Sequence, residues 1–257
     1  MATSKDKSVL AGVAGVYREE APPEPLHPHF RCLWQHTVDP GPSGQIAVVP
    51  DGCVDLVWQG EGLFVAGPDV VASHPDLKAG AELIGVRFQP GAAVSWLGLP
   101  MREIVGRQID LTEVWGPRAR ALAERLGGGR NQAVRVEEFQ RALIGMLGQI
   151  AAPAREMRAA FAMIERGGQT HGLAHRLNLS ERTLRRRFDE HFGYGPKMLE
   201  RILRFQRFLT LARQEAMPLA EIAVAAGYTD QPHLNRDTLA LSGRTPGRIL
   251  QEYSASP

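Results

Sequence analysis

LAHRLNLSERTLRRRF, residues 173–188, is the stretch that decides the fold of the C-terminal part. Apolar residues at helical spacing run up to Asn178, where the chain must turn, and Asn tolerates left-handed backbone better than any residue except glycine. Ser180 then suits the N-cap of a second helix, which Leu184 and Phe188 hold inward at positions i and i+4. The spacing predicts a helix-turn-helix unit over about residues 171–190.

The outward face of this second helix is arginine-rich. Arg182, Arg185 and Arg186 fall at i, i+3 and i+4, opposite the apolar pair. In a helix-turn-helix protein the N-terminal residues of the second helix reach base edges in the major groove. The planar guanidinium group binds both guanine edges and phosphates. We therefore expect these three arginines to contact DNA, whereas Arg187 lies off that face and suits a phosphate contact or a solvated charge.

A similar unit is expected over about residues 218–241, within which residues 222–236 read IAVAAGYTDQPHLNR. Gly227 supplies the turn, and Thr229 or Asp230 suits the N-cap of the next helix. His233 and Arg236 share a face of that helix. The candidate base contacts of this second unit are Gln231, His233 and Arg236.

A long helix should link the two units. The segment from Lys197 to Arg213, some 25 Å long as a helix at 1.5 Å per residue, is rich in apolar residues and contains no Gly or Pro. It predicts one helix over about residues 196–214. Such a spacer can place two recognition helices in successive major grooves, whose repeat is about 34 Å, if the DNA bends somewhat.

On these residues, the stretch from about Ala159 to Ile249 resembles the DNA-binding domain of the AraC/XylS family of bacterial transcription regulators. The resemblance also includes GYGP at residues 193–196, Arg204 on the linking helix and SGRTPGRI at residues 242–249. It implies an all-α fold with two helix-turn-helix motifs, and base contacts at the six positions named above. Three residues depart from the family pattern, namely Asn178 for the turn glycine, Phe208 for an alanine and Thr238 for an aromatic residue.

The charge distribution agrees with a nucleic-acid partner for this part of the chain. The formal net charge is only +2, but residues 1–150 hold 14 Lys+Arg against 17 Asp+Glu, and residues 151–257 hold 16 against 11. The excess of positive charge therefore lies in the C-terminal part, where every cation except Lys197 is arginine. Genome composition can also favour Arg over Lys, so the charge alone does not establish that this part binds nucleic acid.

The first 150 residues read as a separate α+β domain. Residues 46–58, IAVVPDGCVDLVW, predict two strands around a Pro-Asp-Gly turn, and the apolar runs at 63–67 and 83–88 predict two more. From Ala92 onward the spacing becomes helical, with three or four helices. We expect a small β-sheet or barrel-like part followed by helices over residues 1–150, and the all-α DNA-binding domain over residues 151–257.

This half resembles, less specifically, the N-terminal domain of a subset of AraC-type regulators, through PDGCVDLVW, VAGP and GVRFQPGAA at residues 50–58, 65–68 and 85–93. The resemblance implies a sensing or association domain. A ligand pocket needs apolar walls with a few polar groups. The residues that can supply one are Trp58, Phe64, Arg87, Phe88 and Trp96. The aromatic members suit a core still better, and the role of Arg87 stays open.

Other classes of protein find little support in the sequence. Cys32 and Cys53 are too few for a disulfide framework or a four-cysteine zinc site, and no metal site, cofactor motif or catalytic motif is recognisable. The absence of a long apolar run and of a signal peptide predicts a cytoplasmic protein without a membrane partner. An enzyme that uses Cys53, delivered by its helix-turn-helix part, is the alternative from another class.

The leading expectation is a sequence-specific transcription regulator that binds double-stranded promoter DNA. Its N-terminal domain is expected to adjust that binding through a small-molecule effector or a second subunit in a homodimer, and RNA polymerase becomes a partner if the protein is an activator. Activation and repression stay equally open. A purely associative N-terminal domain that binds no ligand also stays open.

Overall fold

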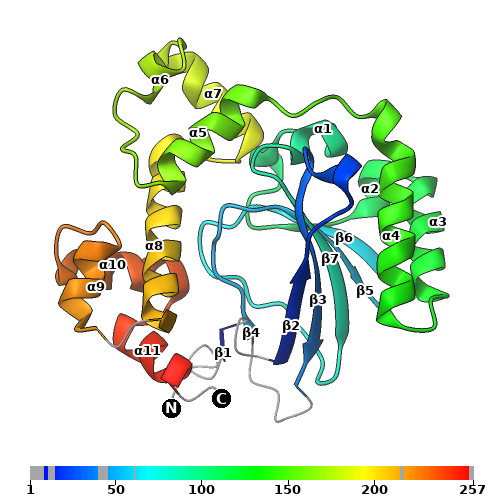
Figure 1. Ribbon diagram of the computed structural model, residues 1–257, viewed down its shortest axis with the longest axis horizontal. Coiled ribbons are helices and arrows are strands. Elements are labelled where there is room, and N and C mark those ends of the chain that lie inside the picture. Colours follow the sequence, from blue (N-terminus) through cyan, green and yellow to red (C-terminus); the bar gives the residue numbers. More distant parts are fainter. Residues whose placement is uncertain (1–8, 11–14, 40–45, 61, 215–216, 255–257) are drawn as a thin grey trace.

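The computed structural model describes residues 9–10, 15–39, 46–60, 62–214 and 217–254. Figure 1 shows a sheet flanked by helices on one side and a helical C-terminal part on the other. None of the helices in the described ranges combines the length and the apolar character needed to cross a bilayer.

A six-stranded antiparallel sheet, in the order β2-β3-β7-β5-β6-β8, forms the N-terminal part. Its strands are β2 (Gly15–Glu20), β3 (Phe30–Val38), β5 (Asp55–Gln59), β6 (Gly62–Ala66), β7 (Glu82–Phe88) and β8 (Gln108–Asp110). The central strand β7 is apolar over most of its length and is largely buried, as expected for a strand covered on both faces.

The turn at Pro50-Asp51-Gly52 does not join paired strands. The segment before it, β4 (Ile46–Ala47), pairs in parallel with β1 (Val9–Leu10) in a separate two-stranded sheet, whereas β5 pairs with β6 and β7. The two strands predicted around this turn are therefore present, but they do not pair with each other. The turn itself forms, because the Asp51 carboxylate accepts the Cys53 N–H at 2.9 Å, but it carries the chain from one sheet to the other.

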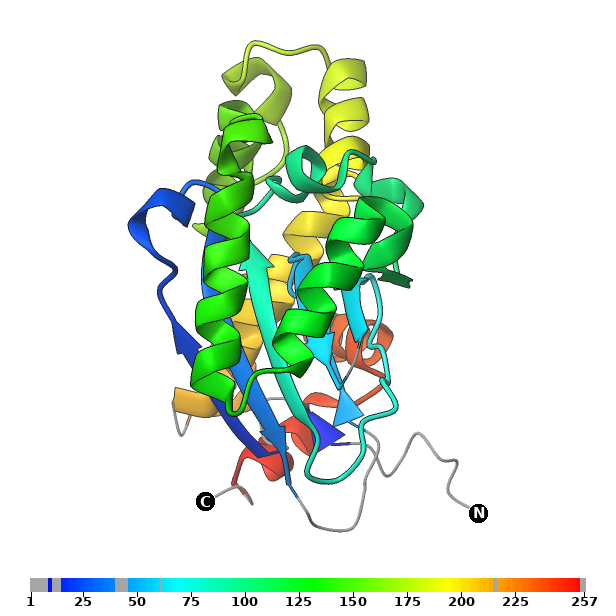
Figure 2. The same cartoon turned by 90° about the vertical axis from the view of Figure 1, so that its right-hand side faces the viewer.

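Helices cover one face of the main sheet, as Figure 2 shows for α3 and α4. The helical elements of this part are η3 (Glu24–Leu26), α1 (Ala93–Leu97), η4 (Met101–Glu103), α2 (Leu111–Trp115), α3 (Pro117–Gly127), α4 (Gln132–Met146) and η5 (Leu147–Gln149). Their apolar faces and the sheet share one buried core, which includes Leu56, Leu122 and Phe139. The predicted order of strands followed by helices is confirmed.

The C-terminal part is entirely helical where it is described. It comprises α5 (Arg155–Glu165), α6 (Leu173–Arg176), α7 (Glu181–His191), α8 (Pro196–Gln214), α9 (Leu219–Ala225), α10 (Gln231–Ser242) and α11 (Pro246–Ser254). The two turns have the expected backbone, with φ of 53° at Asn178 and 92° at Gly227. The core of this part is built around α8 and includes Phe188, Phe205 and Phe208.

The two parts pack against each other at several points. Gln206 of α8 donates to the Pro50 carbonyl at 2.6 Å, and the Ala72 N–H donates to the Leu241 carbonyl of α10 at 2.7 Å. At Gly193, which has φ of +85°, an added Cβ would lie 2.6 Å from a methyl carbon of Val105. This close approach requires glycine, so the contact between the N-terminal part and the end of α7 is specified by sequence.

Candidate functional site

The first candidate recognition helix, α7, begins at a well-formed cap. The Ser180 hydroxyl accepts the Thr183 N–H at 3.1 Å, and Leu184 and Phe188 point into the core. All three predicted DNA contacts on this helix, Arg182, Arg185 and Arg186, are exposed. Only Arg185 has an acidic neighbour, Asp189, at 4.0 Å. The N-terminal half of α7 thus presents guanidinium groups that solvent or DNA can reach.

Arg187 takes another direction. Its guanidinium group forms an ion pair with Glu156 of α5, within the same helical domain. This pairing ties α7 to α5 and compensates the charge of Arg187 inside the protein. Arg187 is therefore neither a solvated charge nor a ready phosphate contact.

A basic groove lies beside α7. Its volume is about 950 Å³, and several cations from α7 and α8 line it. These are Arg182, Arg185, Lys197 and Arg201, and His171 lies at the same groove. Because duplex DNA carries a phosphate charge about every 1.7 Å along its axis, a row of cations of this kind suits the sugar-phosphate backbone.

The second candidate recognition helix, α10, begins at Asp230, whose carboxylate accepts the His233 N–H at 2.7 Å. Among the predicted contacts of this helix, Arg236 is exposed, and Gln231 and His233 are half-buried. Leu234 is fully buried and holds the helix inward. This helix presents one arginine where α7 presents three.

Sequence reasoning missed two exposed residues on α10. Asn235 is exposed beside Arg236, and Leu239, one turn further along, is 53% exposed although it is apolar. Leu239 follows Arg236 by three positions and Asn235 by four, and this spacing could have indicated that they share a face. A polar amide and an isobutyl group therefore stand next to the single arginine of this helix.

A buried carboxylate fixes α10 against α8, and it too was missed. Asp237 is 8% exposed and contacts Arg201 at 2.8 Å and Arg204 at 3.5 Å, both on α8. The oxygen that faces Arg204, Oδ2, also lies 3.7 Å from the imidazole of His233. Tyr228 completes the cluster, with the Arg204 guanidinium 5.0 Å above its ring. The orientation of the second recognition helix therefore depends on ion pairs inside the domain.

The two core departures from the family pattern are both buried. Phe208 and Thr238 have no exposed surface, and the Thr238 hydroxyl has no hydrogen-bond partner among the described residues. A buried hydroxyl without a partner destabilises the folded state. Where the family pattern has an aromatic ring, this chain therefore carries an unfavourable polar group.

The aromatic residues predicted for a ligand pocket lie in the protein interior. Trp58, Phe88 and Trp96 belong to the core between the sheet and the helices, and the Trp96 indole donates to His29 at 3.1 Å. Phe64 packs against a smaller buried cluster on the other face of the sheet. Arg87 differs, because it lines a cavity of larger volume between the two parts of the molecule.

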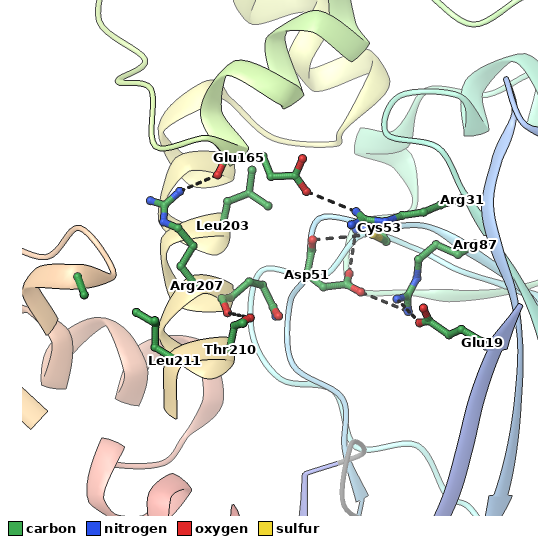
Figure 3. Close-up of a pocket in the computed structure, with 12 residues that line it drawn as sticks. Glu19, Arg31, Asp51, Cys53, Arg87, Glu165, Leu203, Arg207, Thr210 and Leu211 are labelled. Carbon is green, nitrogen blue, oxygen red and sulfur yellow. Dashed lines mark hydrogen bonds and ion pairs between the residues drawn. The ribbon is translucent and has the colours of Figure 1, made fainter. Parts of the chain in front are cut away.

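This inter-domain cavity has a volume of about 510 Å³. Figure 3 shows Arg87, Asp51 and Glu19 on the sheet side and Leu203, Arg207 and Leu211 on α8 opposite. Arg31 and Glu165 form an ion pair across it at 3.6 Å. The cavity thus lies between the sheet and the helix that joins the two helix-turn-helix units.

Arg87 is held by three carboxylates. Asp55, its neighbour on β5, accepts two hydrogen bonds at 3.1 and 3.2 Å. Asp51 lies 3.3 Å from the guanidinium group and Glu19 lies 3.7 Å from it. Cys53 borders the same cluster, and burial together with the Asp51 carboxylate raises the pKa of its thiol well above the usual value. A nucleophilic cysteine needs the thiolate, which this environment disfavours.

No group of three or more His, Cys, Asp and Glu side chains is arranged to hold a metal ion within the described ranges.

Family models match two separate segments of the chain. Residues 173–252 match the family model of a helix-turn-helix domain, and residues 18–110 match that of a domain of unknown function, DUF6597. No curated protein matches the chain in sequence. Among solved structures, the chain is similar to ToxT from Vibrio cholerae O395, with 10% identity, a TM-score of 0.44, and 81% of this chain and 94% of that chain covered. It is also similar to an apo variant of ToxT from Vibrio cholerae strain SCE256, with 9% identity, a TM-score of 0.44, and 93% and 96% covered.

Proposed function

We propose that the chain is a DNA-binding transcription regulator whose helices α7 and α10 read its promoter, because residues 173–252 match the model of a helix-turn-helix domain. The proposed base contacts are Arg182, Arg185 and Arg186 from α7, and Gln231, His233 and Arg236 from α10. Arginine binds the two acceptors of guanine through two parallel hydrogen bonds, each such pair contributing about 1–3 kcal/mol of discrimination.

The observation that carries this proposal is the exposed arginine face of α7. Arg182, Arg185 and Arg186 stand free of the core near the N-terminus of a capped helix, and a groove lined with cations runs beside them. In this geometry a helix in the major groove has phosphate contacts on its flank, which fix the register in which the base edges are read.

For the second helix we add Asn235 and Leu239 to the proposed contacts. An asparagine amide pairs with the two hydrogen-bonding groups on the major-groove edge of adenine, and an apolar side chain packs against the thymine methyl group. Both side chains are exposed on α10 beside Arg236. We therefore expect α7 to favour G·C pairs and α10 to favour a site that contains A·T pairs.

The linking helix supports binding to successive major grooves on one side of the duplex. It contains 19 residues, which corresponds to about 28 Å at 1.5 Å per residue. Because the groove repeat is about 34 Å, simultaneous insertion of α7 and α10 needs a modest bend in the DNA.

We further propose that residues 1–150 adjust the DNA affinity of residues 151–257. Hydrogen bonds from Gln206 to Pro50 and from Ala72 to Leu241 connect the two parts near both units. A small-molecule effector, a second copy of the chain or RNA polymerase can act through these contacts by favouring one arrangement of the parts over another. This role places the protein in the cytoplasm with the DNA that it regulates.

The test is a binding assay of the full chain with duplexes from its own upstream region. We expect Arg186→Ala and Arg236→Ala each to weaken binding to the best site and to relax preference at one or two base pairs, because each removes a base contact. Fluorescence anisotropy on a set of single-base-pair variants of that site measures both effects.

Arg120→Ala is the matched control, because it removes an exposed arginine from α3 in the N-terminal part. It should retain wild-type affinity and preference. If both test variants also behave like wild type, the assignment of these residues is wrong. A loss of equal size on every duplex would instead assign the two arginines to phosphate contacts.

A further inference from the structure

The inter-domain cavity has more negative than positive charge around it. Among the described residues, three carboxylates and three guanidinium groups line it, namely Glu19, Asp51 and Glu165, and Arg31, Arg87 and Arg207. Asp55, which pairs with Arg87 at 3.1 Å, adds a fourth carboxylate next to the lining. Four carboxylates against three guanidinium groups leave one negative charge uncompensated. A ligand that carries one positive charge would balance it.

The three guanidinium groups already have partners within the protein. Arg87 is bound by Asp55, and Arg31 pairs with Glu165. Arg207 donates to the main-chain carbonyls of Ala226, Ile164 and Glu165 at 3.1–3.3 Å. An anionic ligand would therefore have to displace these contacts.

Two carboxylates keep acceptor capacity toward the cavity. Asp51 and Glu19 lie at the edge of the Arg87 cluster, and their side chains remain 34% and 47% exposed. Asp55 differs, because it is more deeply buried and its two oxygens face the Arg87 guanidinium. An ammonium group in the cavity can therefore be bound by Asp51 or Glu19, which Figure 3 shows on either side of the Arg87 guanidinium.

The opposite wall is partly apolar. Leu203 and Leu211 of α8 and Ala225 of α9 line it, and the whole space, about 510 Å³, is within the range of small-molecule sites. A ligand with a charged head and a hydrocarbon or aromatic body would contact the carboxylates at one end and α8 at the other.

From these features we propose that the cavity binds a small organic cation, a primary amine with an apolar body, and that its binding changes DNA affinity. The inference rests on the proposed regulatory function, because it names the class of effector. A ligand that contacts both the sheet and α8 stabilises one arrangement of the domains over others. Since α8 joins both helix-turn-helix units, that arrangement is coupled to how α7 and α10 meet the duplex.

The test uses the full chain and three probes that share a phenyl body but differ in charge. 2-Phenylethylamine is the cation, 2-phenylethanol is neutral and 3-phenylpropionate is the anion. Isopentylamine and n-butylamine extend the amine set. Thermal shift and titration calorimetry at pH 7.5, where alkylamines are protonated, should show that one or more amines bind and that the alcohol and the acid do not.

The variants Asp51→Asn and Glu19→Gln remove one charge each with little change in shape. Each should weaken amine binding about tenfold or more, whereas Glu103→Gln, an exposed carboxylate on η4, should leave it unchanged. The proposal is wrong if none of the amines binds, if the acid binds as well as the amine, or if both variants bind the amine like wild type.

A second measurement tests the coupling. Saturating amine should change the dissociation constant for the upstream duplex at least threefold, and an unchanged constant would overturn the regulatory part of the inference. DNA affinity without ligand is measured in the same series. If only the amine site is wrong, the protein still binds the upstream duplex and this affinity still depends on Arg186. If the proposed function is wrong, the protein shows no sequence-specific DNA binding.

Discussion

The two helix-turn-helix units are built alike but hold their recognition helices by different forces. In the first unit, α7 is held by apolar residues and by an ion pair at its outer side, and its three arginines face solvent. In the second unit, α10 is held by a buried aspartate between two arginines of α8. One unit thus places its charges where DNA can bind them, and the other uses charge to build the domain.

This difference bears on how each unit tolerates change. Exposed ion pairs contribute little to stability, whereas a buried charge that loses its partner is costly. We therefore expect substitutions in the first unit to alter recognition while the fold persists. Substitutions in the second unit should alter stability and recognition together.

The largest effect is expected for Asp237→Ala. It removes the shared partner of Arg201 and Arg204, and the free energy of unfolding should fall by about 3 kcal/mol. The matched change in the first unit is Asp189→Ala, which removes an exposed pair with Arg185 and should cost less than about 1 kcal/mol. Urea denaturation followed by circular dichroism measures both.

Equal losses for Asp237→Ala and Asp189→Ala would show that the buried cluster is not what holds α10. DNA affinity gives an independent readout. Asp237→Ala should also weaken binding to the half-site of α10, in conditions where the variant remains folded.

The next effect concerns how each unit recognises DNA. Asn235→Ala should relax preference at one or two A·T pairs by about 1–3 kcal/mol and leave the salt dependence unchanged, because the side chain is neutral. Lys197→Ala, in the groove beside α7, should weaken binding on all sequences alike and lower the slope of log K against log salt by about 1. Titrations at several salt concentrations separate the two. A changed slope for Asn235→Ala would contradict the assignment.

A smaller effect is expected at Thr238. Replacing its buried, unpaired hydroxyl by a methyl group in Thr238→Val should raise the free energy of unfolding by about 1 kcal/mol. Thr183 in α7 is the control, because its hydroxyl receives a hydrogen bond from Ser180 at 2.9 Å. Thr183→Val should therefore not stabilise the protein. Calorimetric melting of both variants tests the contrast.

The smallest effect concerns the loop around Asp69, which contacts the second unit through the hydrogen bond from Ala72 to Leu241. Burial raises the pKa of Asp69 from 3.8 to about 6, and a hydrogen bond from Ser73 opposes the shift. The folded state therefore holds this proton more tightly than the unfolded chain does. The resulting stabilisation is full below pH 3.8 and is lost as the pH rises through 6.

Asp69→Asn removes this titration. Relative to wild type, its melting temperature should rise by about 2 °C between pH 5 and pH 7.5, a modest value because Asp69 is partly exposed. Asp76→Asn, an exposed change in the same loop, should show no such trend. A constant difference between Asp69→Asn and wild type over this range would refute the prediction.

Local signals in the sequence predicted much of the helical domain. The caps at Ser180 and Asp230 and the turns at Asn178 and Gly227 involve residues within a few positions of one another, so their pattern can be read along the chain. The α+β class of the first half followed from the change of hydrophobic period near Ala92. Strand β3 was missed, because polar Arg31, Gln35 and His36 interrupt its apolar residues.

The features that sequence reasoning missed depend on distant partners. Asp237 lies 36 positions from Arg201, and an aspartate in the middle of a helix ordinarily suggests an exposed site. The cavity brings together the turn at Asp51, the strand residue Arg87 and Leu203 of α8, which no local spacing relates. The Pro-Asp-Gly turn likewise does not determine with which strand β4 pairs, and in the structure it pairs with β1.

The contact between Pro50 and Gln206 has a consequence for synthesis of the protein on the ribosome. The hydrogen bond joins residues 156 positions apart. At about 5–20 residues per second, roughly 8–30 s therefore pass between the synthesis of Pro50 and that of Gln206. During that interval Ala47 and Val49 are not yet buried, because the helical core against which they pack has not been synthesised. This part of the contact between the two halves can therefore form only after α8 has been synthesised.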